Sequence, residues 1–109
     1  MKYLSRPEEL ILLTVWKLKD QAYGVKIRKY VQKMTHKYWS VGSIYVPLDR
    51  LENKGYLDSY MGEATAERGG KSKRYYRITQ EGLAQLEALQ KIHNRFWQDL
   101  PDPSFKKSL

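Results

Sequence analysis

The period of the apolar residues changes along this 109-residue chain, and that change restricts the fold more than any other feature. Up to Gly55 the apolar residues recur at the three- and four-residue steps of helices. Residues 56–61 and 73–79 are instead β-prone runs, joined by residues 62–72, which include three glycines. A helical period returns from residue 80 to about 99. We therefore expect a mostly α fold in which three helices, a small β-hairpin and a further helix follow one another.

The first expected helix is marked at its start and is apolar around most of its circumference. Ser5 and Glu8 fit a capping box, so this helix should begin near residue 6. The apolar residues between Leu10 and Leu18 leave no polar face wide enough for a surface helix. Such a helix needs cover on two sides. One side faces the core, and the other is covered either by a second subunit or by the same chain.

The next two helices differ in how regular they are. The second should open at residues 23–24 and be amphipathic, and the third should span residues 41–54 with Ser40 or Ser43 as its N-cap. The apolar stripe of the second helix comprises Ile27, Tyr30, Val31 and Met34. Pro47 lies inside the third helix, where proline removes one hydrogen bond and clashes with the preceding turn. We therefore expect a kink there, or a helix that starts late.

The positive charge is concentrated in two windows. The formal net charge is +8. Residues 23–37 and residues 68–77 each carry five lysines or arginines and no acid, so the rest of the chain is slightly acidic. The lysines of the first window recur at helical steps and should form a stripe away from the core. A solubilising surface would intersperse both signs, so this pattern favours a polyanionic partner, either nucleic acid or a membrane surface.

Several chemistries lack the residues that they need. The absence of cysteine excludes disulfides and thiolate nucleophiles and fits a cytoplasmic location. His36 and His93 show no metal-ligand spacing and no nucleophile motif frames a serine, so we expect no enzyme, no metal site and no cofactor. The longest apolar run, residues 10–16, is too short to span a bilayer. The second helix has no apolar residues to spare for a membrane surface.

The order of the elements and the place of the charge describe a winged helix-turn-helix domain. It would cover residues 1–79, followed by a C-terminal dimerisation helix at residues 80–100 and a flexible tail at 101–109. In this fold the second helix crosses the DNA backbone, the third enters the major groove and the hairpin wing contacts nearby phosphates or the minor groove. The alternative is a winged helix that binds proteins or RNA without operator specificity.

Four strings of residues resemble the PadR-like transcriptional regulators, in order and at similar spacing. They are Tyr23-Gly24, Gly42-Ser43-Ile44-Tyr45, L-D-R-L-E-N-K-G-Y-L at 48–57 and E-R-G-G-K-S-K-R-Y-Y-R-I-T-Q-E-G at 67–82. The resemblance covers about residues 8–90. One position differs from the family pattern: many members have proline directly after the third-helix tyrosine, whereas here Val46 follows Tyr45 and proline comes at 47.

The resemblance implies a repressor that binds a near-palindromic operator in double-stranded DNA as a homodimer. We expect the groove-facing side of the third helix to contact bases, and lysines and arginines of the second helix and the wing to contact phosphates. The expected DNA-binding residues are Lys26, Lys29, Ser43, Tyr45, Val46, Pro47, Arg50, Arg68, Lys71 and Lys73. Two alternatives stay open, a salt bridge for Arg50 and a buried ring for Tyr45, and Trp39 is expected in the core.

The resemblance also implies pairing through the C-terminal helix, assisted by the first. The expected dimer interface comprises Leu10, Leu13, Leu83, Leu86, Leu89, Ile92 and Phe96. Some compact members of the family bind flat aromatic or cationic small molecules at the dimer interface, which weakens their hold on DNA. The side chains that would line such an effector site here are Trp16, Phe96 and Trp97. The alternative for these aromatic residues is hydrophobic packing between the subunits.

Overall fold

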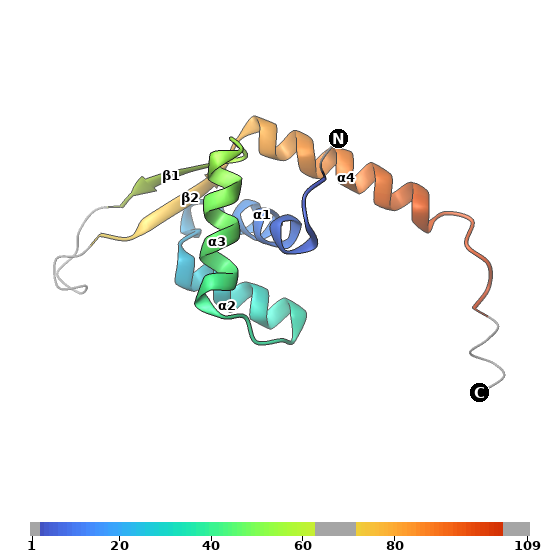
Figure 1. The fold of residues 1–109 in the computed structure, drawn as a ribbon, viewed down its shortest axis with the longest axis horizontal. Helices are drawn as coiled ribbons and strands as arrows, with labels where there is room; N and C mark the ends of the chain where they lie inside the picture. The colour runs from blue at the N-terminus through green and yellow to red at the C-terminus, as the bar shows by residue number, and fades with distance from the viewer. Residues whose placement is uncertain (1–2, 63–71, 104–109) are drawn as a thin grey trace.

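Helix α1 (Arg6–Leu18) lies at the centre of the molecule, and the other elements are arranged around it (Figure 1). This computed structural model describes residues 3–62 and 72–103. The elements that contact α1 are η1 (Lys19–Gln21), α2 (Gly24–Thr35), α3 (Val41–Asn53), β2 (Arg74–Ile78) and α4 (Gln80–Trp97). The chain itself therefore covers the first helix on several sides, although Leu13 and Trp16 remain exposed.

The expected capping box at the start of α1 is confirmed. The Ser5 hydroxyl accepts a hydrogen bond from the Glu8 backbone at 3.2 Å, and the Ser5 backbone donates to the Glu8 carboxylate at 2.8 Å. The same carboxylate pairs with Lys54 Nζ at 2.9 Å, which links α1 to the end of α3. Burial alone would raise the pKa of Glu8, but the hydrogen bonds from Ser5 and Lys54 outweigh it, and the pKa is lowered.

Helix α2 buries one side of the expected apolar stripe. Ile27 and Val31 belong to the core, whereas Met34 is 60% exposed. The expectation that Met34 is buried is therefore wrong. Met34 lies four residues after Tyr30, on a flank of α2 that the described part of the chain does not cover. The helix ends at His36, which adopts a left-handed conformation with φ of 57°.

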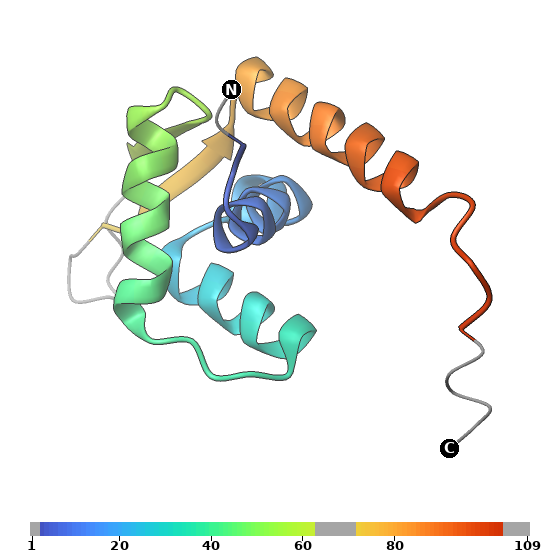
Figure 2. The ribbon, with the colours of Figure 1, turned by 45° about the vertical axis from the view of Figure 1, so that its right-hand side comes forward.

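Helix α3 runs without interruption from Val41 to Asn53 (Figure 2). Ser40 is its N-cap, with its hydroxyl accepting from the Ser43 backbone at 3.1 Å, so the expected late start is wrong. Pro47 is buried, and its expected place on the groove-facing side is also wrong. The reason is helical spacing, because Pro47 lies three residues after Ile44 and four before Leu51, both of which are in the core.

Gly55 ends α3 and turns the chain into the hairpin. Its φ of 82° is a left-handed conformation that glycine adopts without strain. Strands β1 (Leu57–Met61) and β2 are antiparallel, in a register that pairs Leu57 with Ile78 and Met61 with Arg74. The expected strands at 56–61 and 73–79 are confirmed to within two residues.

A backbone bridge attaches the hairpin to the segment before α2. The Tyr76 N–H donates to the carbonyl of Ala22 at 2.8 Å, and Tyr23 forms an isolated antiparallel bridge with Tyr75. Tyr76 is buried, and this burial raises the pKa of its phenol. The base of the hairpin is thus held by backbone pairing on one strand and by core packing on its inner face.

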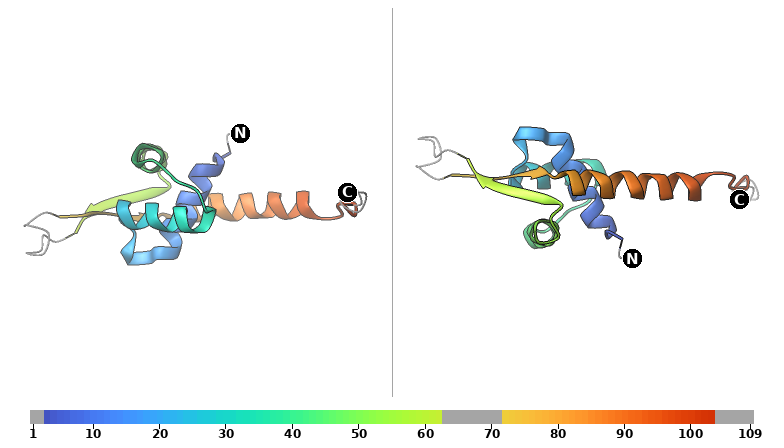
Figure 3. Two further views of the ribbon diagram at one scale, coloured as in Figure 1. Left: turned by 90° about the horizontal axis from the view of Figure 1, so that it is seen from below. Right: turned by 90° about the horizontal axis from the view of Figure 1, so that it is seen from above.

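Helix α4 packs against α1 as far along as His93, whose imidazole lies 2.9 Å from the Glu9 carboxylate, and its end extends away from the rest of the molecule (Figures 1 and 3). Thr79 is its N-cap, and the Thr79 hydroxyl accepts from the Gly82 backbone at 3.1 Å. The hairpin and the far end of α4 point to opposite ends of the long axis. Phe96 and Trp97, in the last turn, are each 77% exposed.

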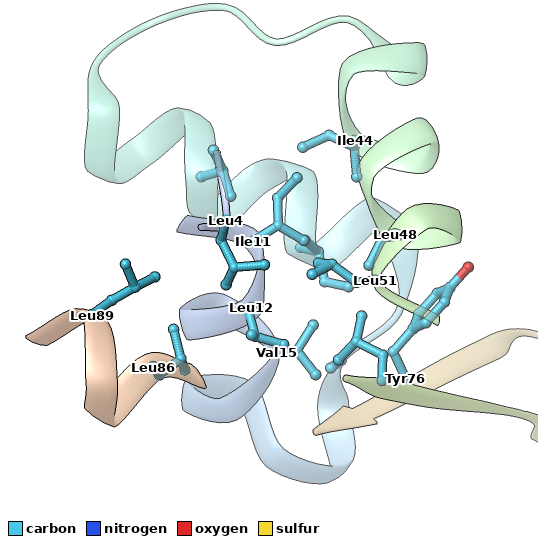
Figure 4. Packing of buried hydrophobic residues seen from close by; sticks show 14 residues of the cluster. Leu4, Ile11, Leu12, Val15, Ile44, Leu48, Leu51, Tyr76, Leu86 and Leu89 are labelled. Carbon is cyan, nitrogen blue, oxygen red and sulfur yellow. The ribbon is translucent and has the colours of Figure 1, made fainter. Parts of the chain in front are cut away.

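The hydrophobic core gathers around α1 and receives side chains from every helix of the described chain except η1, and from both strands (Figure 4). Its members are Leu4, Ile11, Leu12, Val15, Ala22, Ile27, Val31, Ile44, Leu48, Leu51, Leu57, Tyr76, Leu86 and Leu89. Leu86 and Leu89 are only 5% and 6% exposed. Most of the surface of these two leucines is thus covered within one chain, and their expected role at a dimer interface stays a prediction. No helix of the described residues is long and apolar enough to cross a membrane.

Candidate nucleic-acid interface

The side of α3 that faces away from the core carries a small set of exposed side chains. Val46 is 50% exposed, and Arg50 is exposed one helical turn later. None of the ion pairs found among residues 3–62 and 72–103 involves Arg50, so the salt bridge considered for it does not form there. Its five N–H donors are available for an external acceptor such as a guanine edge or a phosphate.

Ser43 shares this side of α3, but part of its hydrogen-bonding capacity is used within the helix start. Its hydroxyl donates to the Ser40 carbonyl at 2.6 Å, while its backbone N–H donates to the Ser40 hydroxyl. The oxygen of Ser43 can still accept a hydrogen bond. A contact with a base acceptor or a phosphate would require the hydroxyl to leave Ser40.

Tyr45 reaches from α3 across to the start of α2. A methyl group on Gly24 would overlap the hydroxyl end of the Tyr45 ring, so only glycine at that position leaves room for the ring. The residue is nevertheless 37% exposed. The side chain thus combines the two alternatives considered for it, since its ring packs against α2 while part of its surface remains open to a ligand.

Three lysines lie on α2 opposite its buried side. Lys29 and Lys33 are exposed and Lys26 is half-buried, and none of them takes part in an ion pair within the described chain. The first turn of α2 contains no acidic residue, and its N-cap Tyr23 makes no side-chain capping bond. Lys37, expected to extend the stripe, follows the end of the helix at His36. The stripe on α2 is therefore three lysines long.

Arg28 lies in the same basic window, but its side chain makes contacts within the fold. Its Nε donates to the Trp39 carbonyl at 2.7 Å, and its guanidinium lies 5.3 Å from the centre of the Tyr38 ring. Trp39 packs against the core, and its indole N–H donates to the Thr35 hydroxyl at 3.0 Å. The expected core position of Trp39 is confirmed, and Arg28 holds the connection between α2 and α3.

The outer face of the hairpin base carries an aromatic cluster that the sequence reasoning missed. Tyr23 meets Tyr75 edge-on and Tyr60 stacks on Tyr75, with ring centres 5.6 Å apart in both pairs. Lys73 Nζ lies 3.8 Å from the centre of the Tyr23 ring, and the Arg77 guanidinium lies 5.2 Å from that of Tyr60. Alternation along the two strands could have placed Tyr60 and Tyr75 on one face, but nothing local linked Tyr23 to them.

Lys73 is thus the one expected wing residue whose surroundings are described. It is half-buried by its contact with Tyr23, which fixes the position of its charge. Arg68 and Lys71, the other expected wing contacts, lie outside the described residues. Because α3 contacts both α2 and β1, the elements that carry the stripe, the outward side of α3 and the hairpin base are neighbours in the fold, and they lie away from the far end of α4 (Figure 1).

The residues expected at the dimer interface and the effector site lie on α1 and α4. Leu10, Leu83 and Ile92 are half-buried, and Leu13 and Phe96 are exposed. A groove of about 440 Å³ between α1 and α4 is lined by Leu13, Trp16 and Leu83, among others, and the His93 imidazole there lies 2.9 Å from the Glu9 carboxylate.

A larger groove, of about 770 Å³, lies between α1 and α2. Trp16 lines both grooves, but Phe96 and Trp97 line neither, so the three aromatic residues do not meet within one chain. Among the residues described, no three histidine, aspartate or glutamate side chains gather into a metal site.

Comparisons with known proteins agree with this geometry. The model of the transcriptional regulator PadR-like family matches residues 12–88. An uncharacterised protein of Lysinibacillus sphaericus is 34% identical over 76 residues, which is 68% of this chain and 67% of that protein.

Solved structures similar to this one include three regulators of the same family. A PadR-like transcription factor from Bacteroides fragilis has 27% identity and a TM-score of 0.70, with 82% of this chain and 81% of that chain covered. A PadR family regulator from Clostridium difficile R20291 has 29% identity and a TM-score of 0.65, covering 84% and 98%. A PadR-like regulator from Bacillus cereus has 25% identity and a TM-score of 0.61, covering 85% and 92%. The chain belongs to the PadR-like family of transcriptional regulators and has the winged-helix fold of its DNA-binding members.

Proposed function

We propose that this protein is a sequence-specific repressor that binds a near-palindromic operator in double-stranded DNA as a homodimer. The observation that carries the proposal is the outward side of α3, where Arg50 is exposed and has no ion pair among the described residues. This helix is flanked on α2 by lysines with no acidic neighbour in the first turn. An uncompensated cation on a helix that fits the major groove is the arrangement that direct base readout needs.

The proposed DNA contacts are of two kinds, to base edges and to phosphates. Arg50 would donate two hydrogen bonds to a guanine, and Val46 would contact a thymine methyl group. Lys26, Lys29 and Lys73 would contact phosphates, which sets affinity and register without reading sequence. Arg68 and Lys71 are proposed to add phosphate contacts from the hairpin tip. Two subunits related by a two-fold axis would place their α3 helices in half-sites roughly 34–36 Å apart.

The proposed dimer uses the apolar surface that the fold leaves open on α1 and α4. With Leu86 and Leu89 already in the core, the candidates with more open surface are Leu10, Leu13, Leu83, Ile92 and Phe96. These side chains are half-buried or exposed in one chain, so pairing would remove further apolar area from water. A dimer formed this way acts in the cytoplasm, where the operator lies.

A small aromatic effector is proposed to release the dimer from DNA. Trp16, Phe96 and Trp97 are exposed and do not meet within one chain, so they could enclose a flat ligand only if two subunits contribute. Such a site would couple ligand binding to the relative position of the two α3 helices. Saturable quenching of tryptophan fluorescence by flat aromatic compounds would support this part of the proposal, and its absence would count against it.

The main experiment compares specific and non-specific binding of an Arg50→Ala variant. A random duplex pool first yields the preferred sequence of the parent protein. Arg50→Ala should then lose about 1–3 kcal/mol per half-site on that sequence and much less on random duplex. Arg6→Ala removes the same charge from the start of α1 and serves as the control, because Arg6 pairs with Glu9 on its own helix and is not among the proposed DNA contacts. Equal losses on both duplexes would refute base readout by Arg50, and stronger competition by single-stranded RNA would favour an RNA-binding module.

A further inference from the structure

The outward side of α3 has a central row of four exposed residues, and one of them is an acid. The row follows steps of four, three and four along the helix, and its members are Gly42, Val46, Asp49 and Asn53. Such steps place side chains one above the other on a helix. The buried residues of α3 lie on the opposite side, toward α1 and α2 (Figure 2). Arg50 lies on a flank of this row, so the row itself would lie deepest in a groove that α3 enters.

The side chains of the row are short, which allows the helix backbone to approach a ligand closely. Gly42 has no side chain, and a methyl group built on it would meet no other atom within 4 Å. Val46 is 50% exposed and ends at its methyl groups. The major groove is wide enough to admit an α-helix. With no long residue holding the helix away from the base edges, the short Asp49 carboxylate can reach them.

The charge of Asp49 is not neutralised within the described chain. Among residues 3–62 and 72–103, Asp49 takes part in no ion pair and no side-chain hydrogen bond. No residue three or four positions away on α3 is a cation, and Glu52 adds a second negative charge. Burial is the largest cause that raises the pKa of Tyr76, and the charges of Asp49 and Glu52 raise it further.

An unpaired carboxylate at this position opposes binding to a polyanion unless a base supplies a hydrogen-bond donor. In the major groove, guanine and thymine present acceptors, which repel a carboxylate. Cytosine presents its N4 amino group, and adenine presents an N6 amino group beside the N7 acceptor. Cytosine is therefore the base that meets a carboxylate with a donor and no acceptor of its own.

We propose that Asp49 is a specificity-determining residue, whose carboxylate accepts a hydrogen bond from the N4 amino group of a cytosine in each half-site. This inference rests on the proposed operator binding and names a base that the operator contains. The same carboxylate rejects guanine and thymine at that position, because their acceptor atoms would face a negative charge. Arg50 on the flank reads a guanine nearby, so each half-site holds a cytosine and a guanine within a few base pairs of each other.

Selection from a random duplex pool with the parent, Asp49→Asn and Asp49→Ala tests this assignment. The parent should prefer cytosine by about tenfold over guanine or thymine at one position of each half-site. Asp49→Asn should change that preference to adenine, because an amide pairs with adenine N6 and N7. Asp49→Ala should lose the preference at that position alone. It should also bind random duplex roughly two- to fivefold more tightly per subunit, because a charge of the same sign as the phosphates is removed.

Glu52→Gln is the matched control for the change in charge. It removes an acid from the same helix but outside the central row, and the amide oxygen of glutamine can still accept the hydrogen bond from the Ser59 hydroxyl, which is 2.7 Å long in the parent. The control should bind random duplex somewhat more tightly and select the same sequence as the parent. A loss of cytosine preference in Glu52→Gln as large as in Asp49→Ala would overturn the assignment, because the effect would then follow from charge alone.

The outcomes separate this inference from operator binding itself. If the parent selects a defined sequence and the Asp49 variants select the same one, the assignment is overturned while the proposed function stands. A parent that binds all duplexes alike overturns both. Binding that is uniformly weaker in Asp49→Ala, on operator and random duplex, also overturns the assignment, because the carboxylate would then orient a cation such as Arg74 instead of reading a base. Circular dichroism of each variant confirms that the chain is folded.

Discussion

Lys29 offers a direct measure of whether α2 contacts the phosphate backbone of DNA. It is exposed in the middle of α2 and forms no ion pair among the described residues, so Lys29→Ala removes a cation without breaking an internal contact. Each phosphate contact contributes about 0.9 to the slope of log K against log salt concentration. A dimer has two copies of Lys29, so the slope should decrease in magnitude by about 1.8. At 0.1 M salt this corresponds to roughly 60-fold weaker binding.

The assay is a titration of labelled duplex by fluorescence anisotropy between 50 and 300 mM salt, on the selected operator and on random duplex. Lys29→Ala should change the slope equally on both, because phosphates carry no sequence information. Lys91→Ala is the control, since Lys91 lies on α4 and pairs with Glu87 at 3.4 Å. A slope that is unchanged in Lys29→Ala, or one that changes as much in Lys91→Ala, would refute the placement of α2 against the backbone.

Three further predictions concern the support of this surface. Glu8→Gln should destabilise the fold by about 1–3 kcal/mol at pH 7, because the ion pair between the buried Glu8 carboxylate and the partly exposed Lys54 is lost. The folded-state pKa of Glu8 is lowered, so the charged carboxylate stabilises the fold at neutral pH, and this contribution is lost as the pH falls through the lowered pKa. The free energy of unfolding should therefore fall less steeply with acid in the variant than in the parent. Gly24→Ala should displace the Tyr45 ring and weaken operator binding more than tenfold while circular dichroism still shows a folded chain; unchanged binding would contradict the packing. Lys73→Ala should weaken operator and random duplex to the same extent in gel-shift titrations, and a loss confined to the operator would argue for a base contact instead.

Much of the fold could be predicted because its signals are local. The Ser5–Glu8 capping box, the Ser40 cap and the left-handed glycine at position 55 each depend on residues within a few positions of one another. The change from helical to alternating period placed the two strands to within two residues. These signals depend on neighbouring residues in the sequence, so they predict the type of each element and where it begins and ends.

The incorrect expectations concern which side of an element is covered, and this depends on distant parts of the chain. Leu86 and Leu89 lie on a stripe of α4 that packs into the core with α1, so most of their surface is already covered within one chain. Met34 lies on a stripe that looks equally apolar but that no described element reaches. The periodicity of a helix gives the direction of each side chain but not the identity of its neighbour. Pro47 was misassigned for a different reason, because helical spacing alone places its direction closer to Leu51 than to Arg50.

The surroundings of the proposed DNA-contacting residues were easier to predict on α2 than at the base of the hairpin. The lysine stripe follows from helical spacing alone, whereas the support of Lys73 comes from Tyr23, fifty residues earlier. The hydrogen bond from Arg28 to the Trp39 carbonyl could not be predicted locally either, because it depends on the folded connection between α2 and α3. Charge windows therefore indicate where cations gather along the chain, and contacts within the fold decide which of them remain available to a ligand.

Tyr23 and Gly24 join the two elements that are proposed to contact the duplex together, α3 and the hairpin. Gly24 makes room for the Tyr45 ring of α3, while Tyr23 pairs with Tyr75 of the hairpin through both backbone and ring. A change at either residue would therefore alter the angle between α3 and the wing as well as the local packing. Binding that needs both elements at once is sensitive to that angle, because a small misplacement costs base and phosphate contacts together. Loss of Lys29 removes phosphate contacts alone, so the two kinds of variant should differ in salt dependence even where they weaken binding equally.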